Sequence, residues 1–216
     1  MYTLDTKAAR EADTNGASIK ELGKYVGEFI QARAIVSKKT QTKGIEFIFK
    51  SDAGQKATLS IYTISATGEH YQGYSMVMGI MTCMGLRSIK PALGVATVYD
   101  YDQKKDVKEQ CEIFTDLCKP IGVLLETEDY KKNNGEMGTR VVLKNVFQAH
   151  TELTTTEILD RKTSPEALPK MVEALRHHPI KSKAKNPAQS GYAGESMPPS
   201  GHPAAGGIDD DDIPFN

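Results

Sequence analysis

The sequence is poor in the residues that build metal and disulfide sites. Among its 216 residues there are three cysteines, Cys83, Cys111 and Cys118, and no two of them form a Cys-x-x-Cys pair. Their odd number and their spacing predict reduced, structural thiols instead of a disulfide framework or a zinc site. No apolar run approaches the roughly 20 residues that cross a bilayer, and the polar, charged N-terminus does not resemble a signal peptide. We therefore expect a cytoplasmic protein without a metal site.

Residue patterns typical of enzymes are also missing. The five histidines form no His-x-x-x-His pair, and neither a nucleophile elbow nor a phosphate-binding glycine loop is present. The glycines of NNGEMG, residues 133–138, precede a predicted strand, so they lack the helix N-terminus that would hold a phosphate. Carboxylates do not cluster as a nuclease or another hydrolase would require. The sequence predicts no enzymatic activity and no cofactor.

Alternating apolar and polar residues, typical of β-strands, dominate the first third of the chain. Residues 23–37, 45–52 and 56–65 each alternate, and short polar segments join them. This pattern predicts a three-stranded antiparallel meander. Gly27 is expected to permit a bend in the first strand.

The periodicity becomes helical after the meander. Apolar residues recur at helical spacing within residues 75–87, where Ser75 is the expected N-cap. Another helix is expected at residues 164–178, with Ser164 as its N-cap. The remaining predicted elements are a strand at 94–102, a short helix at 109–117, a hairpin of strands at 121–130 and 139–149, and a short helical segment at 154–159.

A helix inserted after the third strand of a meander is the layout of the five-stranded OB barrel, the oligonucleotide- and oligosaccharide-binding fold. We therefore expect a mainly β protein with an OB-fold-like small antiparallel barrel, one helix after the third strand, an extra strand or hairpin, and a C-terminal helix. Other small barrels are the alternative. The expected parts are an N-terminal arm at 1–18, the barrel with its C-terminal helix at 19–178, a disordered Pro/Gly/Ser-rich linker at 179–208 and an acidic tip at 209–216.

Basic residues concentrate at the predicted hairpins, although the formal net charge of −1 gives no global attraction for anions. The first and last hairpin loops of an OB barrel flank one face, and a basic groove lined by aromatic rings holds a single nucleic-acid strand. We assign Phe47 and Phe49 to the core and keep the tyrosines as candidate stacking platforms. For any one lysine, a solvated surface position is the alternative interpretation. The candidate DNA-binding residues are Arg33, Lys38, Lys39, Lys43, Lys50, Tyr62, Tyr99, Tyr130, Lys131 and Lys132.

The end of the chain carries the most specific motif. The segment DDDDIPF, residues 209–215, resembles the C-terminal tip of bacterial single-stranded DNA-binding proteins. The segments GKYVGEFIQA, YQGYSMVMGIMTCMGLRSI, KPIGVLLE and TTTEILDRK are similar to the single-stranded DNA-binding proteins encoded by tailed phages, and this resemblance runs from about Ile19 to Arg161. The family tip ends on Phe, whose own carboxylate takes part in docking. Here Asn216 follows Phe215, which predicts a shifted register or weaker docking.

The resemblance implies a sequence-independent single-stranded DNA-binding protein of phage or bacterial DNA replication, recombination and repair, in the cytoplasm of a bacterial host cell. In this family the OB domain holds the strand and the tip recruits partner enzymes. A second interpretation is an adaptor that binds no DNA and whose tail imitates the host tip to divert its partners. Whether the chain forms a homo-oligomer is left open. The implied partner-binding residues are Asp209, Asp210, Asp211, Asp212, Ile213, Pro214 and Phe215.

Overall fold

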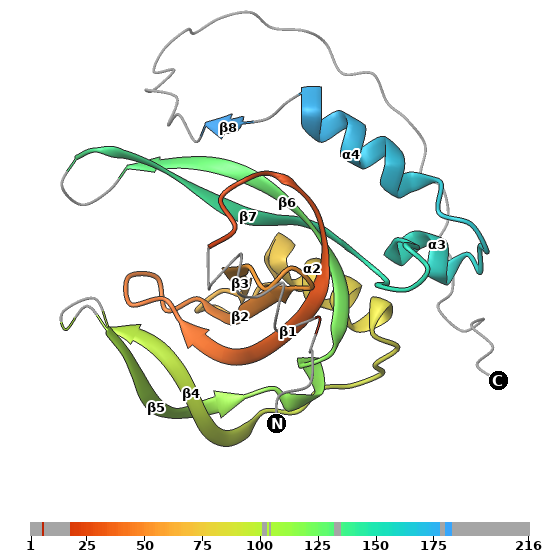
Figure 1. Ribbon diagram of the computed structural model, residues 1–216. Coiled ribbons are helices and arrows are strands. Elements are labelled where there is room, and N and C mark those ends of the chain that lie inside the picture. Colours follow the sequence, from red (N-terminus) through yellow and green to blue (C-terminus); the bar gives the residue numbers. More distant parts are fainter. Residues whose placement is uncertain are drawn as a thin grey trace, which may run out of the picture. The chain divides into compact units, whose positions relative to one another are not determined.

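One sheet organises the described part of the chain (Figure 1). The computed structural model describes residues 6, 18–100, 103, 105–131, 135–177 and 180–182, with the backbone alone for Asp100 and 180–182, and these residues lie within the unit Met1–Lys183. The strands are β1 (Gly23–Val36), β2 (Lys43–Ser51), β3 (Lys56–Ile64), β4 (Ala92–Asp100), β5 (Lys105–Ile113), β6 (Pro120–Lys131), β7 (Met137–Phe147) and β8 (Ile180–Ser182). The helices are α2 (Gln72–Cys83), the 3-10 turn η1 (Thr115–Leu117), α3 (Thr155–Leu159) and α4 (Ala167–His177).

Strand β1 is the centre of the sheet, because it pairs with β2 and β6 along its length and with β5 at Arg33. Its residues 27–36 pair with β2 and its residues 23–28 pair with β6. The hairpins β2–β3, β4–β5 and β6–β7 are antiparallel, and only β8 lies parallel to its neighbour, β6. The predictions of a mainly β antiparallel fold, of a helix after the third strand and of a C-terminal helix are confirmed. Within the described residues no pairing joins β3 to β7, so hydrogen bonds do not close the sheet into a barrel.

A bulge and a glycine shape β1. At Gly27 a side chain would collide with the backbone carbonyl of Lys50, so only glycine permits this close approach to β2. The register then shifts between Phe29 and Gln31, and both Phe29 and Ala32 are buried. The predicted unbroken alternation of residues 23–37 is therefore wrong at the bulge, where one extra residue reverses the faces of the strand.

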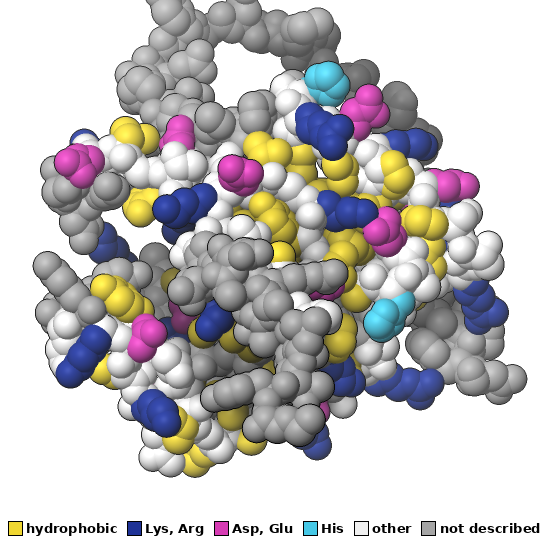
Figure 2. Space-filling view, in the orientation of Figure 1, with side chains coloured by type: hydrophobic (Ala, Val, Ile, Leu, Met, Phe, Trp, Pro, Cys, Tyr) yellow, Lys and Arg dark blue, Asp and Glu magenta, His cyan; other side chains and the backbone are white. Residues whose placement is uncertain are grey.

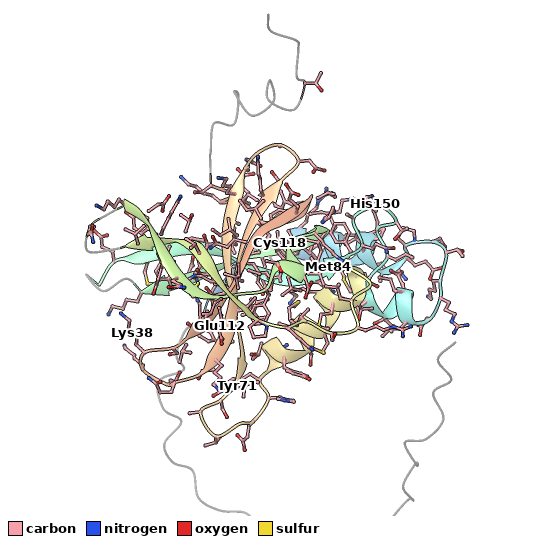
Figure 3. All side chains as sticks on the ribbon, turned by 90° about the horizontal axis from the view of Figure 1, so that it is seen from below. Lys38, Tyr71, Met84, Glu112, Cys118 and His150 are labelled. Carbon is pink, nitrogen blue, oxygen red and sulfur yellow. The ribbon has the colours of Figure 1, made fainter. Side chains whose placement is uncertain are left out.

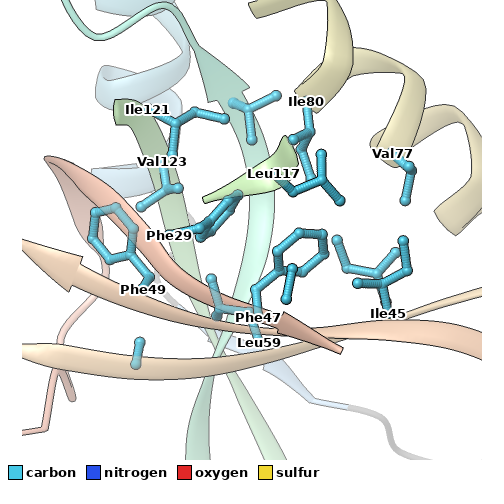
Figure 4. Close-up of a cluster of buried hydrophobic side chains, with 14 of the residues drawn as sticks. Phe29, Ile45, Phe47, Phe49, Leu59, Val77, Ile80, Leu117, Ile121 and Val123 are labelled. Carbon is cyan, nitrogen blue, oxygen red and sulfur yellow. The ribbon is translucent and has the colours of Figure 1, made fainter. Parts of the chain in front are cut away.

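The core lies between the β1–β2–β3 meander, α2 and β6 (Figure 4). The rings of Phe29 and Phe47 are 4.4 Å apart, and Phe49 meets Phe29 edge-on at 6.0 Å. Helix α2 adds Val77 and Ile80 to this cluster. Phe47 and Phe49 are fully buried, which confirms their assignment to the core.

Helix α2 begins earlier than the sequence predicts. Its N-cap is Tyr71 and not Ser75. The first turn packs against β3, where Gly73 lies so close to the carbonyl of Tyr62 that a side chain could not fit. At the other end Gly85 adopts a φ of +65°, and its N–H and that of Leu86 donate to carbonyls of the last turn. This Schellman arrangement ends the helix at Cys83, short of the predicted residue 87.

The predicted helix at 109–117 is wrong. Residues up to Ile113 belong to strand β5, which pairs with β4 along its whole length, and only η1 is helical. The Lys, Glu and Gln residues of this segment favour helices in isolation. Pairing with β4 satisfies the backbone groups instead, while Val107 and Cys111 share the half-buried face of the strand.

The N-terminus of α4 is capped by a side chain of the preceding helix, α3. Glu157 of α3 accepts hydrogen bonds from the backbone N–H groups of Glu166 and Ala167, at 2.6 and 2.8 Å, and from the N–H and hydroxyl of Thr154. The bond from the Thr154 N–H is the largest of the effects that lower the pKa of this buried carboxyl, to about 2. Ser164 is therefore not the N-cap of α4, which starts at Ala167.

The sequence predicts a linker without secondary structure from residue 179, yet Ile180–Ser182 form the short strand β8. This strand pairs with Thr127, Glu128 and Asp129 of β6, on the edge that β1 leaves uncovered. None of the helices described is both long and apolar enough to cross a bilayer.

Candidate functional site

The predicted basic residues of the hairpins lie on one side of the sheet. The ends of the β1–β2, β4–β5 and β6–β7 hairpins point the same way in two perpendicular views (Figures 1 and 3). Lys38 and Lys39 are exposed in the turn after β1, Lys43 is exposed at the start of β2, and Lys131 is exposed at the end of β6. The structure thus brings these four lysines to one side, whereas Lys132 lies outside the described residues.

Two further predicted cations lie on the outward face of the meander and are less available. Arg33 donates from Nε to Oε1 of Glu46 at 2.7 Å, and both side chains are mostly buried. Lys50 is half-buried on the same face of β2. Figure 2 shows basic and acidic side chains interspersed on the visible face, where the described residues form no continuous basic patch. On the face shown in Figure 2 an anion would therefore meet separate positive groups.

A cavity of about 710 Å³ opens between β3 and β7, where the sheet is not closed. Strand β3 contributes Thr58, Ser60 and Tyr62, and Tyr62 is 43% exposed. The start of α2 forms the end of the cavity, and β6 and β7 form its other wall. Of the predicted aromatic residues, Tyr62 alone lines this cavity.

The wall opposite β3 carries charged residues that the sequence reasoning missed. Arg140 donates from Nε and Nη2 to one carboxylate oxygen of Glu128, at 3.1 and 2.9 Å, and its guanidinium lies 5.4 Å from the centre of the Tyr130 ring. Farther along β7, Lys144 forms an ion pair of 3.5 Å with Glu126. Two glutamates two residues apart on β6 thus face two cations four residues apart on β7. Counting back from the hairpin turn places Glu128 opposite Arg140, so this spacing was a signal that could have identified the first pair.

Tyr99 lies apart from this cavity, on the hairpin β4–β5. It is exposed on the same face of β4 as Leu93 and Val95, which are 77% and 63% exposed. The hairpin is tied to β1 by Gln31, whose side-chain amide donates to the carbonyl of Thr97. The predicted tyrosines therefore divide between three places: Tyr62 in the cavity, Tyr130 beneath Arg140 and Tyr99 on β4.

The remaining candidate groups are thiols and the chain end. Cys83, Cys111 and Cys118 are unbridged, and burial raises the pKa of the Cys83 and Cys118 thiols, which makes them poorer nucleophiles. Among the residues described, no three His, Cys, Asp or Glu side chains gather as a metal site would require. The predicted partner-binding residues 209–215 lie outside the described residues. Neither known protein-family models nor curated proteins match this chain in sequence.

Proposed function

We propose that this chain is a sequence-independent single-stranded DNA-binding protein of phage or bacterial DNA replication, recombination and repair. The observation that carries the proposal is the placement of the first and last hairpins, with Lys38, Lys39 and Lys131, on one side of the sheet. The opening between β3 and β7, here called the seam, exposes Tyr62. Lysines at hairpin ends suit phosphates, and an exposed phenol suits a base. Such contacts do not depend on which base is present.

The chain order supports an OB-like barrel as the framework. The meander β1–β2–β3 is followed by α2, and the last hairpin, β6–β7, returns to pair with β1. These are the connections of a five-stranded OB barrel, with β4–β5 as an inserted hairpin between the helix and the fourth barrel strand. In this fold the loops of the first and last hairpins border the nucleic-acid site.

The tail is proposed to recruit partner enzymes. Four aspartates, 209–212, steer toward a basic surface, while Ile213 and Phe215 supply apolar area and Pro214 limits the entropy lost on docking. Strand β8, the last described segment before the tail, pairs with Thr127 and Asp129 of the strand that also carries Tyr130 and Lys131. The acidic tail can also compete with single-stranded DNA for the basic hairpin ends.

One observation favours the adaptor as a second candidate. Three cations of the sheet are neutralised within the chain, in the pairs Arg33–Glu46, Arg140–Glu128 and Lys144–Glu126. A gel-shift series with single- and double-stranded DNA of equal length separates the two functions. A shift of the single strand alone supports the proposed function, and no shift of either at low salt leaves the adaptor.

A further inference from the structure

The cluster of Arg140, Glu128 and Tyr130 has an unusual distribution of exposure. The side chain of Glu128 is 8% exposed, while that of Arg140 is 54% exposed. Both bonds from the guanidinium end on one oxygen of this buried carboxylate. An exposed ion pair would leave both side chains mobile and would contribute little to stability. Here the buried partner fixes the orientation of the exposed one.

The guanidinium of Arg140 is consequently held as a flat plate. Its carbon lies 5.4 Å from the centre of the Tyr130 ring, a separation typical of a cation over an aromatic face. Two of its five N–H groups are used by Glu128. The described residues offer no acceptor to the other three, so the plate keeps hydrogen-bonding capacity as well as an exposed planar surface.

Arg140 also lines the cavity that Tyr62 lines from the opposite strand. The volume of this cavity, about 710 Å³, lies within the range of sites that hold small ligands. Thr58 and Ser60 line the wall of β3, where the Ser60 hydroxyl donates to Glu46 at 3.4 Å, and the Lys144 ammonium lies farther along β7. A planar apolar group with a negatively charged neighbour would find a phenol on one side and a cationic plate on the other.

We propose that one base of the bound strand enters the seam between β3 and β7 and stacks on the Arg140 guanidinium, facing Tyr62. Arg140 then acts through its plane as well as its charge, and Glu128 is a positioning residue. This inference rests on the proposed function, because it takes the ligand to be single-stranded DNA. Guanidinium planes stack on bases as aromatic rings do, and lysine cannot replace them.

Two substitutions separate a stacking plate from a simple positive charge. Arg140→Lys keeps the charge and loses the plane, so oligothymidine affinity should fall about 5- to 20-fold while the salt dependence stays the same. Glu128→Gln adds one unit of positive charge to the cavity, so a purely electrostatic role predicts tighter binding. The plate predicts weaker binding, since Arg140 loses its fixed orientation.

The matched control is Arg176→Lys, on the exposed last turn of α4, which should bind as the unchanged protein does. An oligothymidine carrying one 2-aminopurine gives a spectroscopic readout, because stacking quenches its fluorescence and Arg140→Lys should reduce the quenching. Unchanged affinity in Arg140→Lys, or tighter binding by folded Glu128→Gln, would overturn the stacking role of Arg140 and leave the proposed function standing. Failure of the unchanged protein to bind overturns the proposed function itself. Circular dichroism checks that each variant folds. If Glu128→Gln does not fold, the affinity of Arg140→Lys alone tests whether Arg140 stacks on a base.

Discussion

The side-chain amide of Gln31 pairs with the backbone of Thr97 as a neighbouring strand would. Its Nε2 donates to the Thr97 carbonyl at 2.9 Å, and the Thr97 N–H donates to its Oε1 at 2.8 Å. Direct pairing between β1 and β5 is confined to Arg33 and Ile113. The position of the inserted hairpin over β1 therefore depends strongly on one side chain.

Replacing Gln31 with alanine should loosen the hairpin β4–β5. Both hydrogen bonds are lost and two backbone groups of Thr97 lose their partner, which should cost about 1–2 kcal/mol in the free energy of unfolding. The amide of Thr97 should also exchange with solvent faster in hydrogen-exchange experiments. Gln110→Ala, at an exposed position of β5, is the control. An exchange rate at Thr97 equal in the two variants would contradict this role of Gln31.

The stabilisation that the ionised Glu157 gives should be lost in acid. Its pKa in the folded protein is about 2, against an ordinary value of 4.5. The folded state thus favours the carboxylate, whose contribution is complete above pH 4.5 and is lost as the pH falls toward 2. Glu157→Gln places an amide opposite N–H donors and should cost about 2–3 kcal/mol at pH 7.

The difference in unfolding free energy between the unchanged protein and Glu157→Gln should therefore shrink as the pH falls from 5 to 2. Urea titrations at several pH values measure it. Glu166→Gln is the control, because Glu166 forms an exposed pair with Lys162 and its loss should change stability little. A difference that stays constant with pH would show that the cap does not act through its ionised form.

The strands of the meander could be predicted from the sequence, whereas the helix cap formed by Glu157 could not. Strands β2 and β3 follow from alternation and turn residues, because both signals are local. The cap at Glu157 could not be predicted, since it joins α3 to backbone groups nine and ten residues farther along. Strand β5 was missed because its side chains are mostly exposed and charged, so its apolar alternation is weak and its helix-forming residues dominate.

The candidate site was predicted in part for the same reason. Hairpin lysines and exposed tyrosines can be read from turns and alternation. Glu128 lies opposite Arg140 in an unbroken register from the turn of the β6–β7 hairpin, whereas Lys144, which pairs with Glu126, is the extra residue of the bulge that follows between Leu124 and Leu125. A bulge of this kind leaves no distinct mark in the sequence, so the residues that it brings together could not be paired with certainty.

Tyr62 should contribute to strand affinity without contributing to stability. Its ring is exposed in the seam, so Tyr62→Ala should weaken oligothymidine binding about 5- to 100-fold through the lost stacking. The melting temperature should change little. Tyr71→Ala removes another exposed phenol that does not line the cavity. Equal affinities of the two variants, measured by fluorescence anisotropy, would exclude the seam from the binding site.

Lys38 and Lys39 should set part of the salt dependence. Each phosphate contact contributes about 0.7 to the slope of log affinity against log salt for a single strand. Replacing both lysines with glutamine should lower the magnitude of this slope by about 1.4. The double variant Lys162→Gln and Lys170→Gln removes equal charge near α3 and α4, away from the hairpin ends (Figure 1). A similar decrease in that control would mean that only net charge matters.

Deleting residues 208–216 should strengthen strand binding if the acidic tip competes for the hairpin lysines. The deletion removes four aspartates, and the gain should be largest at low salt, where attraction between the tip and the lysines is least screened. Replacing the four aspartates with asparagines in the full chain is the matched variant. Unchanged or weaker affinity in both variants would contradict competition by the tip.

The most direct test of the central claim is a titration of the full chain with oligothymidine and with a duplex of equal length at several salt concentrations. A single-stranded DNA-binding protein predicts tight binding of oligothymidine that weakens steeply as salt rises, with much weaker binding of the duplex. No binding of oligothymidine at low salt, or equal binding of the duplex, would contradict the account.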